Sequence, residues 1–295
     1  MSMPQTIAIE TYLADRRGDI EMALADACDH RLGTLLDAIR YSLLAGGKRL
    51  RPILVLAAAE AVGGERHQAM PTAVAFEMLH TQSLIYDDLP CMDDDDLRRG
   101  KPTSHKVFGE ATALLAGDAM ITLAVAKILD EAPTVPAEDR LRAASELVRA
   151  NVTMCQGQFE DLRLQGGPAT PDDLISLHRQ KTGSLIAGAL RAGAWIGGGT
   201  AGQVEQLGQY GLELGLAFQI VDDILDHSAT AAELGKTPGK DLAADKATYP
   251  KFFGLAGARG LADEAGARAL AALADWDERA EPLRALVAYV LQRRN

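Results

Sequence analysis

The sequence predicts an all-α protein with one domain spanning residues 1–295. Apolar residues recur at helical spacing along most of the chain, and no segment alternates apolar and polar residues convincingly enough to predict a strand. Most predicted linkers are short and contain Gly or Pro, as at Gly166-Gly167-Pro168, and no low-complexity stretch divides the chain. Aromatic residues make up only 5% of the chain, so its core has to be built from Ala, Leu, Ile and Val.

The predicted helices follow one another from residue 19 to residue 292. An amphipathic pattern covers 19–44 and stops at Gly46-Gly47. Pro52 lies near the first turn of the next helix, and Pro71 is expected to open a third helix that reaches Tyr86. Further helices are expected at 110–130, 137–164, 171–197, 201–227, 257–275 and 278–292. Several of them are apolar on more than one side, which indicates helices packed in the interior.

Small residues are abundant, with 28 glycines and many alanines. They would let helices approach one another closely around a central apolar cavity. The same abundance is also expected from a GC-rich genome, so composition alone leaves both explanations open.

Charge and cysteine usage exclude several classes of protein. The net charge of −11 disfavours nucleic acid and anionic lipid as general partners. No run of about 18 apolar residues predicts a membrane span, and the segment Met1–Gln5 lacks the basic start and apolar run of a secretory signal. Cys28, Cys91 and Cys155 are far apart and form no Cys-x-x-Cys pair, which argues against a disulfide framework or a cysteine zinc site. A reducing cytoplasm is the expected location.

The first acidic cluster begins at the end of an apolar helix, with Asp87 and Asp88, and continues at Asp93–Asp96. Carboxylates at a helix C-terminus are disfavoured by the helix dipole, and a divalent cation would offset this cost. On a straight helix Asp87 and Asp93 would lie about 120° apart, but Pro90 breaks the register and a kinked segment could return Asp93 to Asp87. Taken alone, the run Asp93–Asp96 is also compatible with a solvated loop or a helix cap.

The second acidic cluster lies within an otherwise apolar helix. Asp222 and Asp226 share one face and Asp223 is adjacent to Asp222. Burying these charges unpaired would be costly, so the pattern indicates a metal, although interface ion pairs remain an alternative for this cluster alone. Oxygen ligands without nearby His or Cys favour Mg²⁺ over Zn²⁺. Mg²⁺ takes few carboxylates and keeps positions for substrate phosphates, so two such clusters predict a diphosphate held between two helices.

Basic residues flank the acidic clusters. Lys48, Arg49 and Arg51 follow a glycine pair in a segment that lacks the spacing of a Walker loop, and Arg98-Arg99 follow the first acidic cluster directly. Both groups could bind phosphate oxygens, although a basic turn is often only solvent-facing. His80 lies two helical turns before Asp87 on nearly the same face, where it could bind an anion or simply pack.

Together these motifs resemble the trans-isoprenyl diphosphate synthases of the farnesyl and geranylgeranyl type. The resemblance covers about residue 35 to the C-terminus. It rests on Gly46-Gly47-Lys48-Arg49-Leu50-Arg51-Pro52, Asp87-Asp88-x4-Asp93 with Arg98-Arg99-Gly100, Gly157-Gln158, Lys181-Thr182, and Gln219 with Asp222-Asp223-x2-Asp226. It implies an isoprenoid-synthase fold of helices around a deep apolar cavity, a homodimer and three Mg²⁺ ions. The implied substrates are isopentenyl diphosphate and an allylic diphosphate.

The resemblance also implies a role for each motif residue. Asp87, Asp88, Asp93 and Asp222 would hold Mg²⁺ on the allylic diphosphate, supported by Asp223 and Asp226. Arg98, Lys181, Lys236 and Lys246 would contact that diphosphate, with Thr182 and Gln219 among the matching motif residues. Lys48, Arg51, His80 and Arg99 would bind isopentenyl diphosphate. The expected reaction is ionisation of the allylic C–O bond, condensation with the double bond, and loss of a proton; no Ser, Cys or His nucleophile is required.

The residues before Asp87 suggest the product length. Ser83 and Gln82 stand four and five residues before Asp87, where an aromatic residue would floor the cavity at fifteen carbons in the resembling family. One helical turn, about 5.4 Å, is close to the length of an isoprene unit, so Met78 or Leu79 could form a floor another turn down. The two additional residues Pro90-Cys91 resemble the bacterial and plant branch. These features favour geranylgeranyl diphosphate over farnesyl diphosphate as the product.

Three other interpretations are weaker. A terpene cyclase would not need a second diphosphate site, yet Lys48, Arg51 and Arg99 accompany both acidic motifs. A non-catalytic partner subunit of a synthase heteromer would be expected to lose one acidic motif, whereas this chain keeps both. An acidic cation buffer would leave the basic residues and the helical cavity unexplained.

Overall fold

The computed structural model describes residues 8–27, 32–164, 168–228 and 247–293, and the predicted all-α fold is confirmed. The helices are α1 Ile9–Asp26, α2 Leu35–Leu43, α3 Leu50–Ala61, α4 Arg66–Asp87, α5 Ser104–Phe108, α6 Glu110–Asp130, α7 Ala137–Leu164, α8 Pro171–His178, α9 Ser184–Ile196, α10 Ala201–Ser228, α12 Tyr249–Ala271 and α13 Glu281–Leu291. A π-helix, Arg179–Gly183, joins α8 to α9, and a 3₁₀ turn, Glu278–Ala280, precedes α13.

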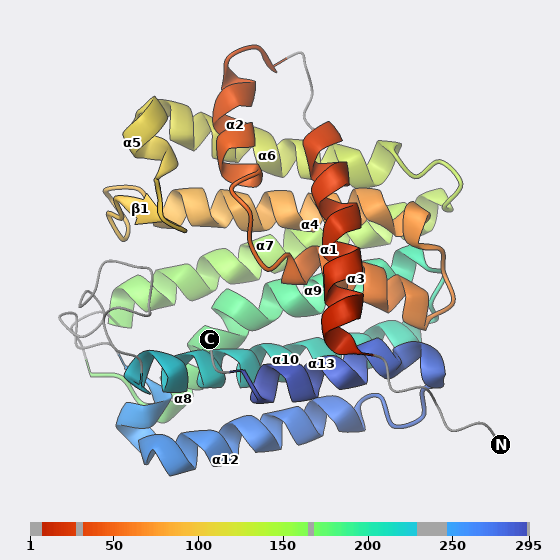
Figure 1. Cartoon of the computed structure of the whole chain (residues 1–295), viewed down its shortest axis with the longest axis vertical. Helices are drawn as coiled ribbons and strands as arrows, with labels where there is room; N and C mark the ends of the chain where they lie inside the picture. Colours follow the sequence, from red (N-terminus) through yellow and green to blue (C-terminus); the bar gives the residue numbers. More distant parts are fainter. Residues whose placement is uncertain (1–7, 28–31, 165–167, 229–246, 294–295) are drawn as a thin grey trace.

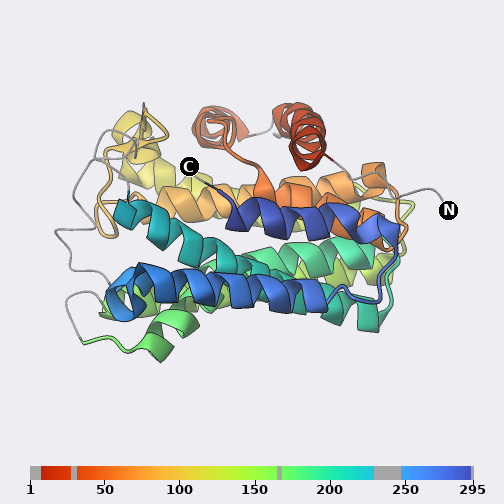
Figure 2. The ribbon, with the colours of Figure 1, turned by 60° about the horizontal axis from the view of Figure 1, so that its bottom comes forward.

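The helices stack in layers, with α9 in the interior (Figures 1 and 2). Helix α9 contacts α3, α7 and α10, which explains why it is apolar all round rather than along one stripe. Helices α1 and α2 lie over the layer that contains α4 and α6, and α12 packs on α10 at the opposite side (Figure 2). The main apolar core extends from Ile20 of α1 to Val290 of α13, and a second apolar cluster lies between α10 and α12.

Glycines permit the closest helix contacts. A Cβ atom on Gly193 of α9 would lie 2.2 Å from the Val55 carbonyl oxygen of α3, and one on Gly211 of α10 would lie 2.7 Å from the Cα of Ala187. A methyl group at either position would force the two backbones apart. At these positions the small residues therefore serve close packing.

Several predicted helix boundaries are confirmed and others are wrong. The ranges 110–130 and 137–164 coincide with α6 and α7, and 201–227 ends one residue short of α10. The single helix expected at 19–44 is instead α1 and α2. The range 171–197 contains the π-helix, and α12 begins at Tyr249 rather than at 257, with a bend at Gly254 (φ 67°).

Pro71 lies inside α4 instead of opening it, because α4 begins at Arg66. A proline at the sixth helical position removes only one backbone hydrogen bond, next to an exposed first turn where water can replace it. The structure also has a two-stranded hairpin, β1 Leu97–Arg98 and β2 Lys101–Pro102, which the sequence analysis missed. Strands of two residues are too short to produce an alternating pattern.

The fold brings both acidic motifs to one end of the bundle. Helices α4 and α10 both end at the left of Figure 1, where the β1–β2 hairpin follows α4 and the π-helix packs against α10. The first acidic motif follows the last turn of α4, and the second lies in the last two turns of α10.

Candidate active site

The first acidic motif turns back on itself after α4. The amide of Asp93 donates to the carbonyl oxygen of Asp87 at 2.9 Å, and the amide of Asp95 donates to that of Asp88 at 3.3 Å. Asp94 adopts a left-handed conformation in this turn (φ 49°). The break at Pro90 therefore returns Asp93 to Asp87, as the sequence predicts.

Burial disfavours the charged form of the Asp87 carboxylate. It raises the pKa of Asp87 to about 6, with Lys181 acting in the opposite direction and Asp93 adding to the increase. Burial likewise raises the pKa of Asp88, although Arg98 opposes the change and its Nε donates to Asp88 Oδ1 at 2.7 Å. The structure thus assembles negative charge in a partly dry environment, where a bound cation would be stabilised.

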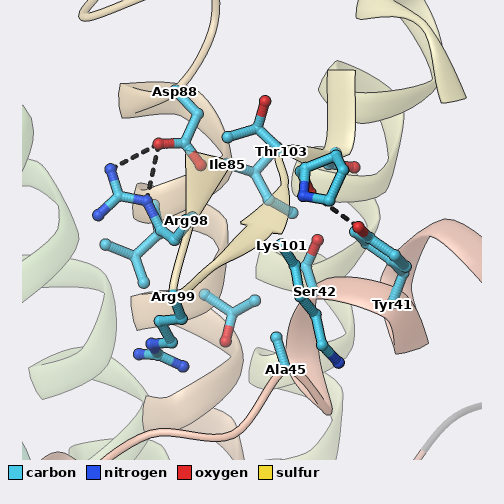
Figure 3. A pocket seen from close by; sticks show the side chains of 13 residues that line it. Tyr41, Ser42, Ala45, Ile85, Asp88, Arg98, Arg99, Lys101 and Thr103 are labelled. Carbon is cyan, nitrogen blue, oxygen red and sulfur yellow. Dashed lines mark hydrogen bonds and ion pairs between the residues drawn. The ribbon is translucent and has the colours of Figure 1, made fainter. Parts of the chain in front are cut away.

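The two consecutive arginines of the hairpin serve different sites. Figure 3 shows Arg98 directed to Asp88, beside a pocket between the hairpin, α2 and α4. Arg99 takes a left-handed conformation (φ 54°), and its guanidinium donates to the carbonyl oxygen of Gly46. The Tyr41 hydroxyl of α2 donates to the Pro102 carbonyl at 2.7 Å and holds the hairpin in place. The turn after β1 therefore separates two neighbouring cations into two sites.

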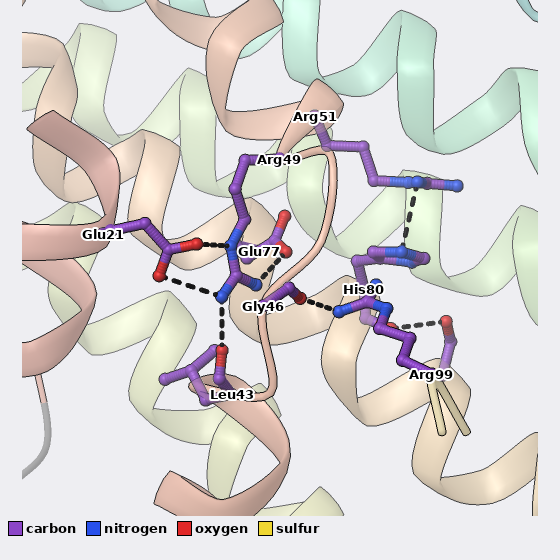
Figure 4. Close-up of polar contacts among 9 residues, drawn as sticks. Glu21, Leu43, Gly46, Arg49, Arg51, Glu77, His80 and Arg99 are labelled. Atoms are coloured by element: carbon purple, nitrogen blue, oxygen red, sulfur yellow. Dashed lines mark hydrogen bonds and ion pairs between the residues drawn. The ribbon is translucent and has the colours of Figure 1, made fainter. Parts of the chain in front are cut away.

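Arg99 joins a basic cluster with Arg51 and His80 (Figure 4). Arg51 Nη1 lies 3.3 Å from His80 Nε2. Burial lowers the pKa of His80 well below its usual value, and Arg51 and Arg99 lower it further, so the imidazole is neutral at pH 7. The buried Nε of Arg51 has no hydrogen-bond partner in the described part of the chain. The partly buried guanidinium of Arg51 and the exposed side chain of Arg99, beside a neutral imidazole, form a suitable site for an anion.

Arg49, between Lys48 and Arg51, has a structural role instead. It adopts a left-handed conformation (φ 50°), and its guanidinium is fully buried. It binds Glu77 Oε1 at 2.6 Å, Glu21 Oε1 at 2.8 Å and the Leu43 carbonyl at 2.9 Å (Figure 4). This ionic network fixes the segment that carries Lys48 and Arg51 to α1 and α4.

The second acidic motif is held by contacts to three parts of the chain. Asp223 Oδ2 accepts a hydrogen bond from the Tyr249 amide at 3.1 Å, and Asp223 Oδ1 accepts one from Gln219 Nε2 at 3.3 Å. Burial raises the pKa of Asp223 to about 6. Asp222 forms an ion pair with Arg293 near the C-terminus, and Asp226 is exposed.

Lys181 and Thr182 lie between the two acidic motifs. The π-helix carries both residues: Lys181 lowers the pKa of Asp87, and the Thr182 hydroxyl donates to Gln219 Oε1 at 3.2 Å. A Cβ atom on Gly157 would lie 2.5 Å from the Lys181 amide nitrogen, so this glycine lets α7 approach the π-helix. The Gly157-Gln158 and Lys181-Thr182 motifs therefore meet in space.

Asp161 is a site residue that sequence reasoning missed. Its Oδ2 accepts from Lys181 Nζ at 2.6 Å, and both side chains are partly buried. Asp161 follows Gly157 by four residues on α7, so it lies on the same helix face. That spacing was available in the sequence, but the partner lies 20 residues further on.

The remaining predicted residues have varied positions. Burial lowers the pKa of Lys48 and Arg293 lowers it further, while Asp222 opposes both. The effect of Asp222 indicates that Lys48 lies near the second acidic motif. Gln82 and Met78 are buried in α4, and the half-buried Ser83 donates to the His80 carbonyl at 2.8 Å. Lys236 and Lys246 lie outside the described residues.

The carboxylate oxygens of the two acidic motifs suit Mg²⁺, although these side chains are not arranged around one metal position. Across the described ranges, no three His, Cys, Asp or Glu side chains are grouped to hold a metal ion. Arg98 and Arg293 bind Asp88 and Asp222 instead. The partly buried carboxylates Asp87 and Asp223 have raised pKa values and supply oxygen atoms, which a hard divalent cation prefers.

Fold and site together define an all-α enzyme with two acidic motifs and a separate basic cluster. The polyprenyl synthetase family model matches residues 33–287. The chain belongs to this family, and it is a prenyltransferase.

Individual relatives agree with this assignment. The chain is 48% identical over 271 residues to geranylgeranyl pyrophosphate synthase 11, chloroplastic, of Arabidopsis thaliana, covering 89% of this chain and 75% of the relative. The crystal structure of an FPP/GFPP synthase from Zymomonas mobilis is 34% identical with a TM-score of 0.86, and covers 97% of this chain and 100% of its own. A polyprenyl synthase from Caulobacter crescentus, complexed with calcium and isoprenyl diphosphate, is 26% identical with a TM-score of 0.85 and 99% coverage of both chains.

Replacing Asp161 by Asn is expected to lower kcat about tenfold, because the ammonium of Lys181 loses a charged partner while a weaker hydrogen bond remains. The KM for isopentenyl diphosphate should change little, since the Arg51–His80–Arg99 cluster is not altered. Steady-state kinetics on each substrate measure both values. Glu160→Gln, which weakens an ion pair with Arg163 and leaves the contact between Asp161 and Lys181 in place, is the control; an equal effect of the two substitutions would contradict this role.

Asp87→Asn should stabilise the metal-free protein by about 1–2 kcal/mol at pH 7.5. The pKa of Asp87 is raised from 3.8 to about 6 in the folded state, so folding favours its protonated form. The stability that this form contributes is present below pH 3.8 and lost as pH rises through about 6. The advantage of the Asn variant should therefore disappear near pH 4.

Urea unfolding in the presence of a chelator measures this difference at both pH values. Asp263→Asn, at an exposed position of α12, controls for the loss of one negative charge. A stabilisation that is the same at both pH values, or a destabilised Asn variant, would show that Asp87 is not strained.

Proposed function

We propose that this prenyltransferase condenses isopentenyl diphosphate with an allylic diphosphate and that its main product is geranylgeranyl diphosphate. One observation carries the two-substrate assignment: the Arg51–His80–Arg99 cluster is separate from the first acidic motif, because Arg98 and Arg99 diverge to different partners. A terpene cyclase binds a single diphosphate and would not need this second cationic site. The names of the geranylgeranyl pyrophosphate synthase relatives support the product assignment.

The allylic diphosphate would bind at the first acidic motif. Asp87, Asp88, Asp93 and Asp222 would hold Mg²⁺ there, supported by Asp223 and Asp226; three ions are expected. When bound, the metal would neutralise charge on the diphosphate leaving group. The positive charges of Lys181 and Arg98 both act to lower the pKa of Asp87, and both side chains would contact the same diphosphate, with Thr182 and Gln219 fixing the π-helix beside it. Lys236 and Lys246 are proposed as further contacts.

Isopentenyl diphosphate would bind Lys48, Arg51 and Arg99, and the neutral His80 would donate a hydrogen bond. The allylic C–O bond breaks with its electron pair going to the diphosphate, and the double bond of isopentenyl diphosphate attacks the resulting cation. A proton is then lost to the diphosphate product. The residues of this chain supply charge and position, and an aliphatic lining would have to keep water from the cation.

The α4 residues before Asp87 support a long product. Ser83 is small and lies one turn before Asp87, while Gln82 is buried beside Tyr86. The Tyr86 ring in turn packs over Gly117 of α6. With no aromatic side chain at 82 or 83, we propose that the growing chain passes this level and that Met78, one turn further, lies near its floor.

Gln82→Phe is expected to shift the main product from twenty carbons to fifteen or fewer, because the aromatic ring would fill space one turn from Asp87. Mass spectrometry of the products made with Mg²⁺, isopentenyl diphosphate and dimethylallyl, geranyl or farnesyl diphosphate measures the shift. Gln209→Phe, on the exposed side of α10, is the control. An unchanged product distribution would show that Gln82 does not face the growing chain.

The unmodified protein tests the proposal itself in the same assay. A product that stops at fifteen carbons would identify a farnesyl diphosphate synthase with the same chemistry. Absence of condensation with every starter would favour a non-catalytic partner subunit of a heteromer.

A homodimer is proposed from an exposed apolar stripe on α7. Leu141, Val148, Val152 and Phe159 follow one another at spacings of seven, four and seven residues, and the last two are 65% and 60% exposed. This is the spacing of a helix that packs against another helix. The neighbouring helix α6 adds exposed Leu114 and Leu115. A second copy of the chain is the proposed cover for this surface.

The same surface bears on membrane association. By length and composition alone, α6 is apolar enough to cross a membrane, with 33% of its most apolar stretch buried. However, it packs against α4, α2 and α7 within the bundle. We therefore propose that its exposed apolar side is covered by the second copy and spans no membrane. Exposed free thiols at Cys91 and Cys155 support a reducing, cytoplasmic location; Cys28 is outside the described residues.

Val152→Asp should convert the dimer into a monomer at micromolar concentration, because a buried unpaired carboxylate in the interface is costly. Size-exclusion chromatography with light scattering measures the mass. Leu270→Asp changes an exposed leucine on α12 and should leave the mass unchanged. A Val152→Asp variant with the mass of the unmodified protein would contradict this interface.

A further inference from the structure

The last described residue of the chain reaches back to the second acidic motif. Arg293 follows α13, yet its guanidinium forms an ion pair with Asp222 Oδ1 on α10. The guanidinium carbon also lies 4.0 Å from the centroid of the Phe218 ring. Because Phe218 and Asp222 are four residues apart on one helix, a single side chain contacts both.

This contact differs from an ordinary surface ion pair. The Arg293 side chain is only 5% exposed, and its buried Nε has no hydrogen-bond partner in the described part of the chain. Arg293 also acts electrostatically on Lys48, a residue of the basic segment before α3. The guanidinium is therefore retained in a partly dry position by the Asp222 carboxylate and the Phe218 ring, where a charged pair is stronger than in water.

The position of α13 brings Arg293 to this point. The last turn of α13 is tied to α12, since Arg259 Nη1 donates to the Leu291 carbonyl at 2.8 Å. The Gln292 amide continues the helix pattern and donates to the Ala288 carbonyl at 3.0 Å. Arg293 thus reaches Asp222 from a helix end whose position these hydrogen bonds fix.

We propose that Arg293 is an internal counter-cation of Asp222, which occupies this carboxylate when no divalent metal is bound and leaves it when metal binds. The proposal rests on the function proposed above, in which Asp222 holds Mg²⁺ on a diphosphate. A guanidinium paired to the carboxylate and a metal ion bound to it are competing partners. Competition lowers the apparent metal affinity, and by linkage metal binding weakens the hold on the C-terminal end of α13.

The test measures metal binding without turnover. Mn²⁺ is titrated into the full-length protein in the presence of inorganic pyrophosphate, and free Mn²⁺ is followed by electron paramagnetic resonance. We expect Arg293→Ala to bind Mn²⁺ about tenfold more tightly than the unmodified protein. Arg259→Ala is the matched control, because it removes one positive charge and loosens the same helix end without contacting Asp222. Its affinity should stay within about twofold of the unmodified protein.

Two results would overturn the proposal. One is equal affinity of the Arg293→Ala and Arg259→Ala variants, which would reduce Arg293 to one charge among others. The other is weaker binding by Arg293→Ala, which would make Arg293 a ligand-binding group rather than a competitor.

Hydrogen exchange on the unmodified protein gives a second, independent readout. Mn²⁺ with pyrophosphate should accelerate exchange of the Gln292 amide, because release of Arg293 frees the end of α13. Unchanged or slower exchange at saturating metal would contradict the proposal even if the variants were poorly folded. Asp222→Ala separates the two levels of inference: if its Mn²⁺ affinity equals that of the unmodified protein, the proposed metal role of Asp222 fails, whatever Arg293 does.

Discussion

Partial burial of carboxylates at one end of an apolar bundle, together with their mutual repulsion, is the constraint that shapes this protein. Two unit charges 4 Å apart interact by about 4 kcal/mol at an effective dielectric constant of 20, while a folded domain has only about 5–15 kcal/mol of total stability. The two acidic motifs therefore cannot share one partly buried end of the bundle unless their charges are compensated. Burial raises the pKa values of Asp87 and Asp223, and repulsion from neighbouring aspartates of the same motif adds to the increase.

Basic side chains from other elements of the chain compensate these negative charges. Arg98 binds Asp88, Asp161 holds Lys181 beside Asp87, and Arg293 binds Asp222. The left-handed turn at Arg99 then sends the second arginine of the hairpin away to Arg51 and His80. As a result the negative site and the cationic site stay separate, as a reaction between two diphosphates requires.

The sequence predicts most of the fold and the motif part of the site, because both are local patterns. Helices α6 and α7 match the approximate ranges that the sequence predicts, because apolar residues recur at helical spacing in both. The range 19–44 was misread as one helix, because apolar spacing continues in phase across two shorter ones. The π-helix at Arg179–Gly183 was missed, since it changes the hydrogen-bond pattern without interrupting the helical sequence pattern.

The partners of the motif residues were harder to predict, because they depend on tertiary contacts. Asp161 is 20 residues from Lys181, and Arg293 is 71 residues from Asp222. No periodicity links such pairs, and an arginine near a chain end is usually solvated. The same partners also bear on the proposed function: Arg293 would compete with a metal ion for Asp222, and Arg98 and Lys181 would lie close to the diphosphate. Loading the site is then an exchange of partners rather than a neutralisation of bare charge, which lets a marginally stable bundle hold two acidic motifs before any ligand arrives.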